Sequence, residues 1–222
     1  QGIVLQGTAA GGLERMQAVF DRGRLVGFHA NRQAEEGVGG GDLVKESVAA
    51  DAARIHMERI GRHLAWHGGL SIDYLVDGQG IPRYIDANPR LAEPGNALAS
   101  GVNLPDLLVQ VSLGQHPPLH AVATPGIRSY MGIQGLLRTA HDSDSRRAVA
   151  GTIIDLVRRR GLFAQGTEEL TPANEGIRSS IPMLTLGVAL LAEPSLWKRF
   201  SSATVNAYAA TPGVVEFVQA RH

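Results

Sequence analysis

Two short stretches of alternating apolar and polar residues, joined by a glycine-containing turn, constrain the fold of this chain more than any other feature. Residues 70–76 (Leu-Ser-Ile-Asp-Tyr-Leu-Val) and 82–88 (Pro-Arg-Tyr-Ile-Asp-Ala-Asn) flank the turn Asp77-Gly78-Gln79-Gly80. Alternation with a period of two is typical of strands that bury one face, and the turn residues between them favour a hairpin. The sequence therefore predicts an antiparallel β-hairpin.

Two acidic residues and an asparagine share one face of this hairpin. If residues 77–80 form the loop, Val76 pairs with Ile81, and Asp73 and Asp86 become diagonal neighbours, roughly 7–8 Å apart. Together with Asn88 they offer hard oxygen ligands, which suit Mg²⁺. The alternative is a half-exposed hairpin whose polar face only meets water. A loop of odd length would place the two acids on opposite faces.

The remaining pattern predicts an α+β protein. Residues 14–20 and 24–30 flank Asp21-Arg22-Gly23 and are expected to form a second hairpin. We expect an antiparallel sheet with packed helices in residues 1–120 and a mainly helical unit in residues 121–222. The expected helices cover residues 51–67 (ended by Gly68-Gly69), 104–113, 145–160 (with Asp144 as N-cap), 181–191 and 194–208.

Composition excludes several classes of protein. Lysine and arginine number 21, as do aspartate and glutamate, so the formal net charge is +0. Proteins that bind nucleic acid or anionic membranes rely on a positive field, so neither partner is expected. There is no cysteine, which excludes disulfides, thiolate zinc sites and a thiol nucleophile. No segment reaches the ~18 apolar residues of a membrane span, and no targeting segment is evident, so the cytoplasm is the expected location.

The carboxylate hairpin resembles a known family. Residues 84–90 (Tyr-Ile-Asp-Ala-Asn-Pro-Arg) are similar to the metal-binding strand of ATP-grasp enzymes, typically acid–x–Asn–Pro–Arg, and residues 71–75 resemble the strand before it. Residues 37–42 (Gly-Val-Gly-Gly-Gly-Asp) are similar to a loop on the nucleotide side. The likeness covers roughly residues 1–115 and is nearest to the ATP-grasp domain of the carbamoyl-phosphate synthase large chain, with biotin carboxylase more distant.

The resemblance implies a ligase that uses ATP and Mg²⁺, with Mn²⁺ as an alternative ion. In this family ATP phosphorylates a carboxylate, and an amine or similar nucleophile attacks the acyl phosphate. The implied partners are therefore a small carboxylate and an amine, and a homo-oligomer stays open. The implied site residues are Asp73, Asp86 and Asn88 for the metal, Arg90 as the catalytic contact to phosphate or acyl phosphate, Leu5 and Gln6 beside adenine, and Gly39, Gly40 and Gly41 facing phosphates.

Several departures from the family pattern matter. Both metal acids are Asp where Glu is more common, Gly39 replaces a His of the carbamoyl-phosphate synthase pattern, and Gln6-Gly7 lacks the usual acid after the hinge strand. We expect the chain to be the C-terminal portion of a longer protein, inactive alone, whose partner is the lysine-bearing N-terminal lobe. The alternatives are a non-catalytic ATP-grasp-fold module for binding or assembly, and a metal-dependent hydrolase, which would need a base near the metal.

Two other motifs give weaker indications of function. Residues 37–41 are not a P-loop, because Lys45 follows Val44 and Glu46 stands where Ser or Thr is needed, so a plain glycine-rich turn is the alternative. His63 and His67 have the i, i+4 spacing of a zinc pair, but no Glu follows His63, and a metal role is not expected there.

Overall fold

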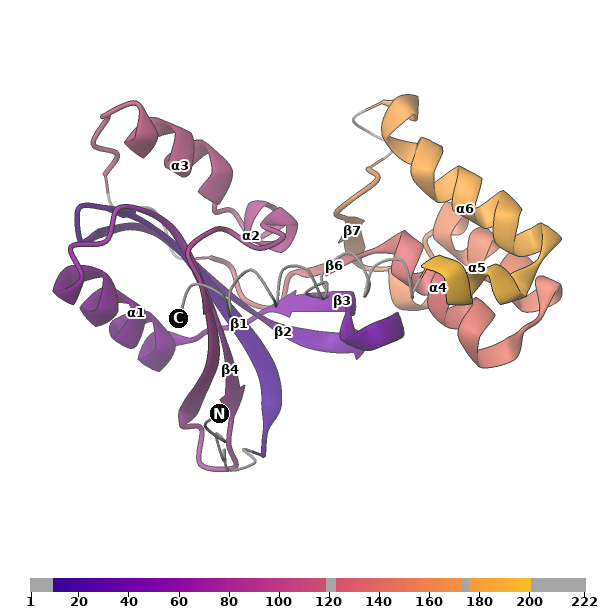
Figure 1. Ribbon diagram of the computed structural model, residues 1–222, viewed down its shortest axis with the longest axis horizontal. Coiled ribbons are helices and arrows are strands. Elements are labelled where there is room, and N and C mark those ends of the chain that lie inside the picture. Colours follow the sequence, from indigo (N-terminus) through magenta and orange to yellow (C-terminus); the bar gives the residue numbers. More distant parts are fainter. Residues whose placement is uncertain (1–9, 119–122, 173–175, 201–222) are drawn as a thin grey trace, which may run out of the picture.

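The computed structural model describes residues 10–118, 123–172 and 176–200, which form an α+β fold around one mixed seven-stranded sheet (Figure 1). The strand order is β5-β4-β1-β2-β3-β6-β7. The strands are β1 (Gly12–Asp21), β2 (Arg24–Glu36), β3 (Asp42–Ser47), β4 (Gly68–Val76), β5 (Pro82–Asn88), β6 (Arg128–Tyr130) and β7 (Gly166–Glu168). The helices are α1 (Asp51–His63), α2 (Gly95–Ala99), α3 (Leu104–Ser112), α4 (Gly132–Ser143), α5 (Arg146–Arg158) and α6 (Ile181–Ala192), with 3₁₀ turns at Val38–Gly40, Gly161–Phe163, Ile177–Ser180 and Pro194–Leu196.

The hairpin predicted for residues 14–30 is confirmed. β1 and β2 pair in antiparallel fashion, and Asp21 lies opposite Arg24. The two turn residues, Arg22 and Gly23, have φ of 47° and 86°. Two positive φ angles give a turn whose twist matches that of the strands, which is why glycine suits the second position.

The carboxylate hairpin predicted for residues 70–88 is also present, but its expected register is wrong. Val76 pairs with Pro82 rather than Ile81, so the loop has one more residue than predicted. A bulge at Ile85 then shifts the register again, and Asp73 pairs directly with Asp86. The extra loop residue alone would have put the two acids on opposite faces, and the bulge returns them to the same face.

The sheet is covered on both sides (Figure 1). α1 packs on one face, where Met57 and Ala53 join an apolar cluster with Met16, Phe20 and Ile72. α2 and α3 cover the other face through a cluster that includes Leu104, Leu107, Val19 and Val26. The first helix ends earlier than expected: the chain leaves it at Leu64, and Ala65 has φ of 45°, so Gly68 already belongs to β4.

The C-terminal helices gather at the β6–β7 end of the sheet (Figure 1). α6 begins at the predicted residue. The expected N-cap of α5 is wrong by one position: the Ser145 hydroxyl accepts a hydrogen bond from the amide of Ala148, while Asp144 takes the left-handed conformation that ends α4. Of the helix expected over residues 194–208, residues beyond 200 lie outside the described part of the chain.

The sheet does not end at residue 120. β6 pairs with β3 in antiparallel fashion, and β7 adds to β6 as a parallel strand, which the expected all-antiparallel sheet did not include. The division into two units near residue 120 stays a prediction. Within the described ranges, no helix is both long enough and apolar enough to cross a membrane.

Candidate functional site

A polar face runs across the strands that carry the predicted metal ligands. The pairings place two adjacent rows of polar residues on the same side of the sheet, because directly paired residues share a face and residues two apart repeat it. The first row is Asp86, Asp73, Arg15 and Asn31, and the second is Asn88, Ser71, Gln17 and His29.

Asp73 and Asp86 form the acidic end of this face. Direct pairing places their Cβ atoms about 5 Å apart. Asp86 is exposed, whereas Asp73 is half-buried, and burial raises the pKa of Asp73. The nearby guanidinium of Arg15 acts in the opposite direction, while the charge of Asp86 adds to the rise. The amide Nδ2 of Asn88 donates to Asp86 Oδ2 at 2.7 Å, so the structure brings all three predicted ligands together.

Arg15 links this acidic pair to the glycine-rich loop. Its Nε lies 3.5 Å from Asp73 Oδ1, and its Nη1 contacts the buried carboxylate of Asp42. Gln33 Nε2 donates to the same carboxylate at 2.8 Å and lies 3.3 Å from the carbonyl oxygens of Gly40 and Gly41. The side chain of Arg15 therefore connects the loop to the acidic pair. Sequence patterns did not predict a role for this residue.

The glycine-rich loop packs against helix α4. The amide of Val38 donates to Gln134 Oε1 at 3.1 Å, and a Cβ at Gly37 would come within 2.6 Å of the same oxygen. Gly39 and Gly40 have positive φ, of 72° and 80°. A side chain at residue 37 would displace the Gln134 carboxamide, whereas Gly39 and Gly40 are favoured by their backbone conformation. Whether this loop faces phosphates stays a prediction.

A buried polar network underlies the middle of the polar face. His29 Nε2 lies 2.9 Å from Asn96 Oδ1, and Asn96 Nδ2 donates to Ser129 Oγ at 2.7 Å. The hydroxyl of Ser129 in turn donates to Glu169, whose other oxygen accepts from Lys45 Nζ at 2.8 Å. Burial lowers the pKa of His29 to about 4 and raises that of Glu169. Sequence patterns did not reveal this network, because its members come from five separated segments.

The network fixes the tautomer of His29. Asn96 Nδ2 donates to other partners, so its Oδ1 accepts, and the proton of the neutral imidazole sits on Nε2 of His29. Nδ1 of His29 is then a bare acceptor. It is buried and has no partner among the described residues, and the same holds for Asn31 Oδ1 and Ser71 Oγ on this face.

Of the remaining predicted residues, Arg90 forms no hydrogen bond or ion pair with the acidic pair in the described part of the chain, and Leu5 and Gln6 lie outside that part. Arg90 is exposed two residues beyond β5, and its Nη1 donates to the carbonyl of Leu91 at 3.3 Å. Leu5 and Gln6 lie outside the described residues. Over the described ranges, no group of three or more His, Asp or Glu residues converges to hold a metal ion.

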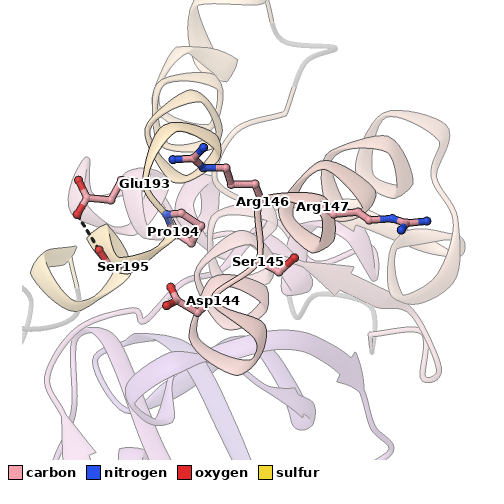
Figure 2. Close-up of a pocket in the computed structure, with 7 residues that line it drawn as sticks. All are labelled: Asp144, Ser145, Arg146, Arg147, Glu193, Pro194 and Ser195. Carbon is pink, nitrogen blue, oxygen red and sulfur yellow. Dashed lines mark hydrogen bonds between the residues drawn. The ribbon is translucent and has the colours of Figure 1, made fainter.

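A separate hollow of about 520 Å³ lies where α4 meets α5, beside the end of α6 (Figure 2). Its arginines do not converge: Figure 2 shows the guanidinium groups of Arg146 and Arg147 pointing away from each other. Glu193 accepts a hydrogen bond from Ser195 at 2.8 Å on the opposite wall. Mixed charge that faces different directions does not make a binding site.

Comparison with known proteins finds similarity only among solved structures. No family model matches the chain, and neither does any curated protein. The biotin carboxylase domain of Hydrogenobacter thermophilus 2-oxoglutarate carboxylase, in complex with ADP, magnesium and bicarbonate, is 11% identical with a TM-score of 0.43, over 53% of this chain and 28% of that one. Campylobacter jejuni biotin carboxylase is 20% identical with a TM-score of 0.41, over 53% of this chain and 28% of that one.

N5-carboxyaminoimidazole ribonucleotide synthetase from Thermus thermophilus is 18% identical with a TM-score of 0.43, over 57% of this chain and 37% of that one. The chain thus matches between about a quarter and two fifths of the length of these proteins, from 28% to 37%.

Proposed function

We propose that this chain is the magnesium- and nucleotide-binding part of an ATP-grasp ligase that activates a carboxylate as an acyl phosphate, in the manner of carbamoyl-phosphate synthase. The observation that carries the proposal is the direct pairing of Asp73 with Asp86, with Asn88 next on the same face and Pro89-Arg90 immediately after it. These residues resemble the acid–x–Asn–Pro–Arg pattern of the family, and this resemblance supports the proposal.

The donor set suits Mg²⁺. Two carboxylates and an amide oxygen are hard ligands, and too few to complete six positions, so phosphate oxygens and water would supply the rest. Bound between these residues and the nucleotide, Mg²⁺ would neutralise phosphate charge. Burial raises the pKa of Asp73, so protons would compete with the ion for this carboxylate. Asn88 must turn its carbonyl oxygen, in place of its N–H, toward the ion.

The chemistry then needs positioning more than a nucleophilic side chain. An oxygen of the substrate carboxylate attacks the γ-phosphorus of ATP, the bond to ADP breaks, and an acyl phosphate forms. The nitrogen of the amine attacks the acyl carbon, phosphate leaves, and the nitrogen gives up a proton. Arg90 would hold the transferred phosphate, and the backbone of Gly39, Gly40 and Gly41 would face the phosphate chain. Leu5 and Gln6 would contact adenine.

Binding of Mn²⁺ in the presence of ADP tests the metal site, because Mn²⁺ is paramagnetic and is read directly by electron paramagnetic resonance. Asp86→Asn and Asp73→Asn should each weaken binding at least about tenfold, the effect of losing a charged ligand worth about 1.4 kcal/mol or more. Asp51→Asn is the control, since Asp51 is an exposed acid on α1. Equal affinity in all four proteins would refute the metal site.

A non-catalytic binding or assembly module is the second candidate. The observation that favours it is that Arg15 and the N–H group of Asn88 already face the two carboxylates, so the pair is partly neutralised without a cation. A module of this kind shows no ADP-dependent Mn²⁺ binding. It would also become more stable in Asp86→Asn, because repulsion between the two acids is removed.

A further inference from the structure

A largely apolar hollow of about 640 Å³ lies between the β6–β7 edge of the sheet and helices α5 and α6. Leu156 and Val157 of α5 and Met183 and Leu184 of α6 line it. Its volume falls within the roughly 300–1,000 Å³ that small-molecule sites occupy. At its mouth, 78% of Val157 and 55% of Leu184 is exposed, which leaves apolar surface for a ligand to cover.

This hollow is separate from the polar face. Tyr130 lines it, whereas the preceding residue, Ser129, belongs to the buried network with Glu169. Successive side chains of a strand point to opposite faces of the sheet. None of the residues proposed to hold magnesium or nucleotide lines the hollow.

Ser180 gives the hollow an unused polar group. The residue is 7% exposed, and its hydroxyl oxygen is buried without a hydrogen-bond partner among the described residues. Buried hydroxyls in folded proteins are nearly always paired. Because Ser180 lines the hollow, a molecule inside it can supply the missing partner.

Arg159 gives the hollow a positive charge. Its Nη2 donates to the carbonyl of Gly166 at 3.2 Å, and it hydrogen-bonds Tyr130. No carboxylate of the described residues forms an ion pair with it. The acid that shares the hollow is Glu168, whose carboxylate is bound instead by backbone amides.

Those amides explain why Glu168 leaves Arg159 unpaired. One oxygen of Glu168 accepts from the amide of Gly132 at 2.8 Å, at the start of α4. The other accepts from the amides of Leu170 and Thr171 at 3.1 and 3.2 Å. Three N–H donors and the positive end of a helix dipole stabilise its charge.

The conformation of Arg159 points the same way. It ends α5 in the left-handed region, with φ of 51°, where glycine is the favoured residue. Strained positions that keep a functional side chain are common at binding sites. Glycine adopts this conformation without strain, so Arg159→Gly removes the side chain and leaves the backbone at the end of α5 unstrained.

We propose that this hollow binds a small monocarboxylate with an apolar chain. The carboxylate would pair with Arg159 and accept a hydrogen bond from the Ser180 hydroxyl, while the chain would pack on Leu156, Met183 and Leu184. The single unpaired arginine matches one negative charge rather than the several of a nucleotide. The proposal is independent of the metal and nucleotide site.

Calorimetric titration of the full chain with octanoate tests it, with octanol as the uncharged probe of equal length. Octanoate should bind at least tenfold more tightly than octanol. Arg159→Gly should remove that preference, while Arg160→Gly, a change at the exposed arginine next to it, should leave octanoate affinity within twofold of the original. Ser180→Ala should weaken octanoate several-fold without lowering the melting temperature of the ligand-free protein, because it removes an unpaired hydroxyl.

The proposal is overturned if octanoate does not bind, if octanol binds equally well, or if Arg159→Gly and Ser180→Ala both keep full affinity. Circular dichroism verifies that each variant is folded. If Arg159→Gly does not fold, Ser180→Ala still decides the test. Self-association through Val157 and Leu184 that octanoate does not disrupt would assign this face to a second copy of the chain instead, and would also overturn the proposal.

Discussion

Asp73 of β4 and Asp86 of β5 face each other directly, and the guanidinium of Arg15 lies next to Asp73 on the neighbouring strand β1. Asp73 therefore responds to two neighbours of opposite charge. Asp86 raises its pKa and Arg15 lowers it, while burial of the carboxyl is the largest influence and raises it. The proton affinity of Asp73 is thus a direct readout of this geometry.

Replacing each neighbour should move the pKa of Asp73 in opposite directions. Asp86→Asn removes a negative charge and should lower it, whereas Arg15→Gln removes a positive charge and should raise it. The measurement is the pH titration of the Asp73 carboxyl carbon by nuclear magnetic resonance. Asp51→Asn serves as the control, because α1 packs on the other face of the sheet. Shifts of the same sign in the two variants would contradict the arrangement.

His29 should make the protein sensitive to acid. Its pKa is about 4 in the folded chain against 6.5 for an ordinary histidine, because the ring is fully buried. The unfolded chain then binds the proton more readily, so stability is complete above pH 6.5 and falls as the pH drops toward 4. The loss from this group is on the order of 3 kcal/mol.

Urea unfolding at pH 7.5, 6 and 5 measures this effect. His29→Gln keeps an N–H donor for Asn96 but cannot titrate, so its free energy of unfolding should fall less than that of the original chain over this range. The exposed His63→Gln should behave like the original. A parallel loss in all three proteins would show that His29 is not the responsible group.

Lys45 and Glu169 form a buried ion pair, with each side chain 3% exposed. Lys45→Met leaves the carboxylate of Glu169 without its cation, which should cost about 3–5 kcal/mol of stability at pH 7. The double change Lys45→Met with Glu169→Gln should recover part of that loss, because no buried charge remains. Urea unfolding of the two single variants and the double variant gives the coupling. An unchanged Lys45→Met would exclude a buried pair.

Two helical glycines should respond oppositely to alanine. In α1, a Cβ at Gly61 would lie 2.0 Å from Cε1 of Phe20, which is fully buried and cannot move away. Gly61→Ala should therefore destabilise the protein by about 1–3 kcal/mol. In α5, nothing lies within 4 Å of a Cβ at Gly151, so Gly151→Ala should stabilise by about 0.5–1 kcal/mol. Thermal unfolding of both variants distinguishes packing from helix propensity.

Local patterns predicted the elements with strong periodicity. The hairpin around Gly23, the strands that carry Asp73 and Asp86, and helix α6 all follow from spacing and turn residues. That the two acids share a face was also predicted, but through a register that the structure replaces. A five-residue loop and a bulge at Ile85 each shift the pairing by one residue in the same direction. The combined shift of two residues returns the acids to one face.

Long-range partners could not be predicted in this way. Arg15 and Asp42 are 27 residues apart, and Lys45 and Glu169 are 124 residues apart, so no window of sequence contains both members of either pair. β6 and β7 have three residues each, too few for a period to be recognised. Glu169 lies in a polar stretch of sequence, and nothing in that stretch distinguishes a residue of a solvent-exposed loop from one that joins a buried hydrogen-bond network.

The pairing of Lys45 with Glu169 also has a consequence for biosynthesis. Two carboxylates pair with Lys45: Glu93 follows it closely in the chain, whereas the buried Glu169 is made 124 residues after it. At about 5–20 residues per second, the nascent chain would carry Lys45 for roughly 6–25 seconds before Glu169 is even synthesised. In the first part of that interval, before β6 is made, the outer edge of β3 is an open template for other strands. The charge of Lys45 would keep that edge hydrated and so protect the unfinished chain from pairing with its neighbours on the ribosome.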